Sequence, residues 1–187
     1  MANKYDHLFI SGASPEIQKT RPLPAIGFLD GKTFEGCNGL HVFWVGTTSH
    51  NAYGTKGWGE IYHGPHMHKY PEIFMHLGTD PDNPMELGAE VEMFVGREKE
   101  RHLITKSTIM YFPANFPHSP WRIIKVTRPF LIVTVNQSPQ HTEKALWDMV
   151  PKELYDRMIM IDAGYEDEGI PSKFHWPKAA GPEGNYI

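Results

Sequence analysis

Short runs of β-branched and aromatic residues recur between residues 40 and 137, and turn-forming residues separate them. Runs of this length, bounded by Gly, Pro, Asn and Asp, are typical of β-strands. The pattern predicts nine strands, over residues 41–46, 58–63, 66–68, 72–77, 90–95, 101–105, 108–112, 121–126 and 130–135. Because no helical segment interrupts them, the sequence predicts an all-β antiparallel sandwich or barrel.

The two ends of the chain have different patterns from this core. Residues 1–39 contain turn signals and little periodicity, which predicts an N-terminal arm packed on the core. Residues 138–187 form a C-terminal extension that ends in a tail rich in Pro and Gly. Within it, residues 142–150 and 151–160 are predicted to form one or two short α-helices, because acidic residues and a proline occupy first-turn positions.

Composition and charge limit the classes of protein to consider. The length of 187 residues fits a single domain, residues 1–187, with the arm and the extension attached to the core at 40–137. The balance of 18 Lys and Arg against 22 Asp and Glu gives a net charge of −4, which recommends neither nucleic acid nor an anionic membrane as a partner. One cysteine, Cys37, excludes an intrachain disulfide. With no apolar signal segment after Met1, we expect a cytoplasmic protein.

The segment from Gly64 to Glu72 contains the most informative spacing in the chain. His66 and His68 are two residues apart, so on a strand they point the same way, with backbones roughly 6–7 Å apart. Two imidazoles at that separation can converge on one metal ion. If Tyr70 and Pro71 form a bend, Glu72 can provide a third ligand. Two imidazoles and a carboxylate suit Fe, Mn, Ni, Co or Zn.

A fourth candidate ligand lies after a later predicted strand. The segment from Pro113 to His118 is a proline-containing turn between the strands at 108–112 and 121–126. A histidine at the exit of such a turn would return an imidazole toward the first sheet. We therefore add His118 to the candidate metal ligands.

Two motifs in these segments resemble those of the cupin family. His66-x-His68-x3-Glu72-x5-Gly78 resembles the first cupin motif, and Pro113-x-Asn115-x2-His118 resembles the second. The departures are small. The opening Gly of the first motif is Gly59, one residue too far away, Asn115 replaces a usual Gly, and Arg122 replaces a closing Asn. Asn tolerates positive φ, so the turn is expected to survive.

The resemblance covers residues 42–137 and implies both a fold and a metal site. The implied fold is a double-stranded β-helix, the cupin jelly-roll barrel. The implied ligands of one divalent transition-metal ion are His66, His68, Glu72 and His118. The motifs do not identify the metal.

Four further residues are candidates for the cavity of the barrel. Strand alternation puts His76 on the face of Glu72, where it either lies near the metal or is a hydrogen-bonded core residue. Glu92 is a candidate acid or base if its face lines the cavity, although paired acids favour a solvent face. Arg122 is a candidate clamp for a substrate carboxylate or phosphate, and Tyr62 for hydrogen bonding to an anion or for barrel packing.

Two classes of function remain open at this point. One is a metal-dependent enzyme, an oxygenase, isomerase or lyase, acting on a small polar or carboxylate-containing molecule. The other is a small-ligand binding or structural protein without turnover. The sequence lacks a nucleophile elbow, a phosphate-binding loop and a zincin helix. We also expect a homodimer, because an arm and an apolar extension leave edges to cover.

Overall fold

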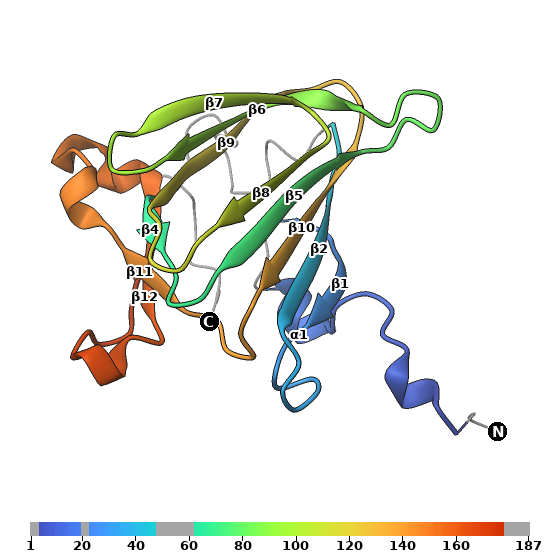
Figure 1. Ribbon diagram of the computed structural model, residues 1–187, viewed down its shortest axis with the longest axis horizontal. Helices are drawn as coiled ribbons and strands as arrows, with labels where there is room; N and C mark the ends of the chain where they lie inside the picture. Colours follow the sequence, from blue (N-terminus) through green and yellow to red (C-terminus); the bar gives the residue numbers. More distant parts are fainter. Residues whose placement is uncertain (1–3, 20–22, 48–61, 178–187) are drawn as a thin grey trace.

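The computed structural model describes residues 4–19, 23–47 and 62–177, in which two sheets face each other across a barrel (Figure 1). The first sheet contains, in spatial order, β1 (Ala25–Leu29), β2 (Gly39–Val45), β10 (Phe130–Asn136), β5 (Glu72–Gly78) and β8 (Thr108–Phe112). The second contains β13 (Lys173–His175), β12 (Met158–Ala163), β11 (Glu143–Ala145), β4 (His66–Met67), β9 (His118–Val126), β6 (Glu86–Val95) and β7 (Glu100–Lys106). A short strand, β3 (Tyr62–His63), pairs with β12 and β9.

The order of the strands is that of a jelly roll. Strands β2, β5, β8 and β10 belong to the first sheet, and β3, β4, β6, β7 and β9 belong to the second, so the chain passes repeatedly between the sheets. The pairs among these strands are antiparallel. The predicted all-β fold, a double-stranded β-helix, is confirmed. Of the strand predicted at 58–63, only Tyr62 and His63 belong to the described residues.

Alternating apolar side chains fill the space between the two sheets. Val91 and Met93 on β6 are fully buried, as are Val45 on β2 and Phe130 on β10. In a strand, side chains at i and i+2 share a face. This alternation therefore lets each sheet bury one face in the barrel.

The N-terminal segment is more than an arm. Residues 25–29, inside the segment predicted to lack periodicity, form β1 and pair antiparallel with β2 at the edge of the first sheet. A short helix, α1 (Pro15–Lys19), and a 3₁₀ turn, η1 (Asp6–Leu8), precede this strand. Tyr5, Leu8 and Phe9 are exposed on the part that extends away from the barrel (Figure 1).

The predicted C-terminal α-helices are wrong. Residues 142–150 contain strand β11 and a 3₁₀ turn, η3 (Trp147–Met149). Residues 151–160 contain a 3₁₀ helix, η4 (Lys152–Arg157), and the start of β12. Pairing of β11 with β4 and β12 supplies the backbone hydrogen bonds that a helix would have supplied. Among the described residues, no helix is both long and apolar enough to cross a membrane.

Candidate metal centre

Strand register brings His66 and His118 together. His66 on β4 lies directly opposite His118 on β9, and their ring centroids are 4.3 Å apart. His68 immediately follows β4, and its ring centroid is 4.9 Å from that of His66 and 5.1 Å from that of His118. The three side chains are buried, and their candidate ligand nitrogens all lie within 4.8 Å of one another. They could therefore hold one metal ion.

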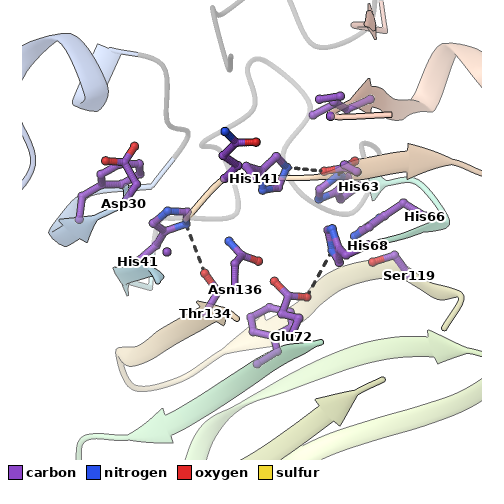
Figure 2. Close-up of a pocket in the computed structure, with 18 of the residues that line it drawn as sticks. Asp30, His41, His63, His66, His68, Glu72, Ser119, Thr134, Asn136 and His141 are labelled. Carbon is purple, nitrogen blue, oxygen red and sulfur yellow. Dashed lines mark hydrogen bonds and ion pairs between the residues drawn. The ribbon is translucent and has the colours of Figure 1, made fainter. Parts of the chain in front are cut away.

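Glu72 reaches His68 and His118 from the other sheet. The chain bends at Lys69 and Tyr70, and β5 begins at Glu72. Glu72 Oε2 is 3.6 Å from His68 Nε2 and 3.4 Å from His118 Nε2. Figure 2 shows the carboxylate pointing toward His68. The structure thus brings all four predicted ligands to one place.

Backbone carbonyls fix the orientation and the tautomer of the three imidazoles. His66 Nδ1 is 2.8 Å from the carbonyl oxygen of Gly64, and His118 Nδ1 is 3.1 Å from that of Phe116. His68 Nδ1 bonds to the carbonyl of Thr142. Because a carbonyl only accepts, each Nδ1 carries the donated hydrogen, and in its neutral form each ring directs the lone pair of Nε2 into the cluster.

The unpartnered nitrogens fit a bound metal ion. Nε2 of His68 and Nε2 of His118 are buried and have no hydrogen-bond partner among the described residues. Buried polar atoms normally have a partner, so each unpaired atom needs an explanation. An ion that accepts the lone pairs of three imidazoles and one carboxylate oxygen would provide it, and such a set suits divalent transition metals.

The turn before His118 connects the two motifs. Asn115 has φ = 60°, so asparagine does adopt the left-handed conformation expected at this position. Its backbone N–H donates to the carbonyl of His68 at 2.7 Å. The Phe112 ring stacks on His118 at 4.3 Å. Gly78, which ends the first motif, passes so close to β6 that a Cβ there would lie 2.0 Å from the Glu86 carbonyl oxygen.

Burial and neighbouring charges shift the pKa values of the cluster. Burial is the main reason that the pKa of His66 lies well below 6.5. Burial also opposes protonation of His68, but the Glu72 carboxylate outweighs it and raises the pKa of His68 to about 9. Burial raises the pKa of Glu72, whereas the charge on His68 and the nearby His118 imidazole bring it well below 4.5. Because an imidazole binds a metal only in its deprotonated form, a metal ion at this cluster would compete with a proton on His68.

A second polar group borders the metal cluster, and the sequence reasoning missed it. The Glu143 side chain is only 1% exposed, and its carboxylate accepts hydrogen bonds from His63 Nε2 at 2.7 Å and His141 Nε2 at 3.2 Å. The His63 ring stacks on His66 at 4.4 Å, and the His141 ring lies 5.7 Å from that of His68. The alternation of His141 and Glu143 was a possible signal, but the helix predicted over these residues obscured it.

The charge on Glu143 is stabilised inside the protein. Burial raises its pKa, but the charges of His63 and His66, together with its hydrogen bonds, lower it to well below 4.5. Burial lowers the pKa of His63, yet Glu143 more than offsets this effect and raises it. The carboxylate therefore remains ionised at neutral pH and holds the imidazole that packs on His66.

Both polar groups line a cavity of about 690 Å³ between the sheets (Figure 2). Figure 2 places His63, His66, His68 and Glu72 on one side and His41 and Thr134 on another. The cavity is also lined by the apolar residues Leu23, Phe28, Phe43, Phe74, Trp121, Ile132, Ile159 and Ile161. A volume of this size suits a small-molecule ligand.

Of the four other candidate residues, His76, Glu92 and Arg122 are not among the described residues that line this cavity. His76 is fully buried beneath it and accepts a 2.9 Å hydrogen bond from Trp121 Nε1. Glu92 and Arg122 are paired with each other and are not among the described residues that line the cavity. Tyr62 belongs to β3, and its side chain lies outside the described residues, as does Gly59.

Glu92 is expected to stabilise the fold rather than the cavity. It is 2% exposed and bonds to Arg122 and Arg101. Replacing it with glutamine is expected to reduce the free energy of unfolding by about 1–3 kcal/mol at pH 7, because charge-assisted hydrogen bonds are lost. Urea unfolding of the wild type and the variant measures this difference. Glu90→Gln, on the same strand, is the control and should change stability little.

The loss caused by Glu92→Gln should depend on pH. Burial raises the pKa of Glu92, but hydrogen bonds from Arg122 and Arg101 outweigh burial and lower it from 4.5. A carboxylate with a lowered folded pKa contributes stability above its unfolded pKa and loses it as the pH falls through the folded value. The difference between wild type and variant should therefore shrink below about pH 4.5. An equal difference at pH 7 and pH 3 would contradict this assignment.

Solved structures with similar folds match parts of this chain. A conserved protein with a double-stranded β-helix domain from Klebsiella pneumoniae has 11% identity and a TM-score of 0.42, over 76% of this chain and 94% of that one. The DMSP lyase DddQ from Ruegeria pomeroyi has 15% identity and a TM-score of 0.34, over 56% of this chain and 40% of the lyase. An oxalate oxidase in complex with the substrate analogue glycolate has 16% identity and a TM-score of 0.41, over 72% of this chain and 62% of the oxidase.

These similarities concern the fold alone. This chain matches less than two thirds of the length of the lyase and of the oxidase. No protein-family model matches the sequence, and no curated protein matches it. Any activity must therefore be argued from the site itself.

Proposed function

We propose that this chain, a jelly-roll protein of the cupin type, is a mononuclear metalloenzyme that acts on a small molecule. The ligands would be His66, His68, Glu72 and His118. The observation that carries this proposal is the set of three Nδ1 to carbonyl hydrogen bonds, which direct three Nε2 atoms toward one another beside the Glu72 carboxylate. Such outer hydrogen bonds orient histidines at metal sites.

The donor set defines what a bound ion would contribute. Three imidazoles and one carboxylate suit Fe, Mn, Co, Ni or Zn and leave two positions open in a six-coordinate ion. The ion would supply Lewis-acid activation of a carboxylate or enediol or, if it is iron, activation of O₂. The reaction class would accordingly be isomerase, lyase or dioxygenase.

The surrounding residues would hold the site in shape. Glu143 fixes His63, which packs on His66, and Phe112 packs on His118. Apolar side chains from both sheets line much of the cavity, together with polar residues that include Asp30, Lys32 and Gln140. A preorganised and buried site of this kind strengthens the interaction between an ion and the charge that develops on a substrate.

Elemental analysis of untagged protein, purified without chelator, tests the proposal. We expect about one metal ion per chain, and much less in His66→Ala. Iron would direct the activity screen to O₂ consumption with catechols, thiols and keto acids, whereas zinc, manganese or nickel would direct it to isomerase and lyase substrates. A protein that takes up no metal even after reconstitution would overturn the proposal and favour a binding protein without turnover.

We further propose that the protein is a cytoplasmic homodimer. Ile109 and Tyr111 are exposed on β8, an edge strand of the first sheet. Edge strands with exposed apolar side chains are commonly covered, and two-fold dimers are the most frequent closed assembly. A mass near 21.4 kDa by light scattering would contradict the dimer.

A further inference from the structure

The wall that the first sheet presents to the cavity is arranged in three cross-strand rows. Strands β2, β10 and β5 are paired in register along this wall. From the metal cluster inward, the rows are Gly39, Asn136 and Glu72, then His41, Thr134 and Phe74, then Phe43, Ile132 and His76. All of these except His76 line the cavity. Because side chains at i and i+2 share a face, each row is one step deeper into the barrel.

Polarity changes along these rows. The first row carries the Glu72 carboxylate and the Asn136 amide, the second mixes polar and aromatic side chains, and the third presents Ile132 and Phe43 to the cavity. Four residues of strand separate the first row from the third, which corresponds to about 13 Å. Along this wall, the cavity is therefore polar at the metal cluster and becomes apolar toward the third row. The distance between the first and third rows is longer than one aromatic ring.

The opposite sheet continues the apolar part of the cavity. Trp121, Ile159 and Ile161 line it from β9 and β12. The rings of Trp121 and Phe74 are 6.1 Å apart, within the range of aromatic contacts. The buried His76 accepts a hydrogen bond from the Trp121 indole and so fixes the orientation of this wall. Two aromatic side chains, Phe74 and Trp121, therefore line the cavity together.

We propose that the ligand of this site has an oxygen-donor head group, such as a 2-hydroxycarboxylate, joined to an aromatic body. The head group would bind at the metal cluster, and the ring would lie against Phe74, Thr134 and Trp121. A ligand consisting of a head group alone leaves the apolar rows without contacts, whereas a ring buries apolar surface there. This inference rests on the proposed metal centre and adds the substrate class.

Glycolate and mandelate form a matched pair that tests the inference, because they share the 2-hydroxycarboxylate head and differ by a phenyl ring. Isothermal titration of each into the metal-loaded protein is expected to give a Kd for mandelate at least about tenfold lower than that for glycolate. Equal affinities, or tighter binding of glycolate, would overturn the inference.

Two variants localise the ring. Thr134→Phe extends a side chain into the middle row and is expected to abolish the preference for mandelate while retaining metal and glycolate binding. Val133→Phe is the control, because Val133 is the next residue on β10 and faces away from the cavity. A mandelate preference that survives in Thr134→Phe would overturn this placement of the ring.

The same experiment separates this inference from the proposed metal centre. Metal content is measured on every sample before titration. Absence of metal in the wild type contradicts the centre, and the titrations of metal-free protein then still report whether the cavity prefers the phenyl ring. Normal metal content with no preference contradicts the aromatic substrate class alone.

Discussion

Replacing His118 with alanine is expected to weaken metal binding by at least about tenfold. His118 faces His66 across a strand pair, and its Nε2 is buried without a hydrogen-bond partner among the described residues. The substitution removes one of three imidazole donors and leaves Glu72 with His68 as its remaining close histidine. Competition with a chromophoric chelator gives the affinity, and elemental analysis gives the stoichiometry.

His102→Ala provides the matched control for this variant. His102 lies on β7, is about half exposed, and pairs with Glu100 at the surface. Its loss should leave metal affinity and stoichiometry unchanged. Circular dichroism verifies that both variants remain folded. If His118→Ala binds metal as tightly as the wild type, the cluster is not the metal centre.

The barrel could be predicted because the residues of each strand by themselves indicate a β-strand. In the segment 130–135, β-branched and aromatic residues between turn signals specify a strand wherever it pairs, and β10 forms there. The four clustered residues could also be predicted, since the spacing of His66, His68 and Glu72 and the turn before His118 follow from local chain geometry.

The C-terminal extension could not be predicted in the same way. Strand β11 has only three residues, Glu143–Ala145, and it forms because β4 and β12 lie on either side of it. An acidic residue and a nearby proline are equally compatible with a helix start and with a strand followed by a turn. Pairing with β4 and β12 selects the strand over the helix, and the local sequence does not indicate that pairing.

The group around Glu143 could not be predicted from the sequence for a related reason. Glu143 and His63 are 80 positions apart and meet only because β3 and β11 both pair with β12. Neither residue belongs to a motif, so its role depends on strand order. Arg122 illustrates the converse case, because its position next to a motif suggested a cavity residue, yet the structure pairs it with Glu92.

Removing the metal is expected to destabilise the protein by about 4 kcal/mol when the reference sample contains free metal at about 1,000 times its Kd. An ion that binds the folded state and not the unfolded chain stabilises the folded state by mass action. The cluster spans both sheets, since Glu72 lies on β5 whereas His66 and His118 lie on β4 and β9. The ion would therefore add a link across the barrel that unfolding must break.

Chemical unfolding with and without a chelator measures this contribution, and adding the metal back should restore it. His118→Ala should show a much smaller difference between the two conditions, because its occupancy at the same metal concentration is lower. This comparison separates metal bound at the cluster from metal bound elsewhere on a chain with eleven histidines. A wild-type protein whose midpoint does not move on chelation, although it contains metal, would place that metal outside the cluster. If the ion binds between the two sheets, we expect the free energy of unfolding and the metal occupancy of the four-residue site to change together.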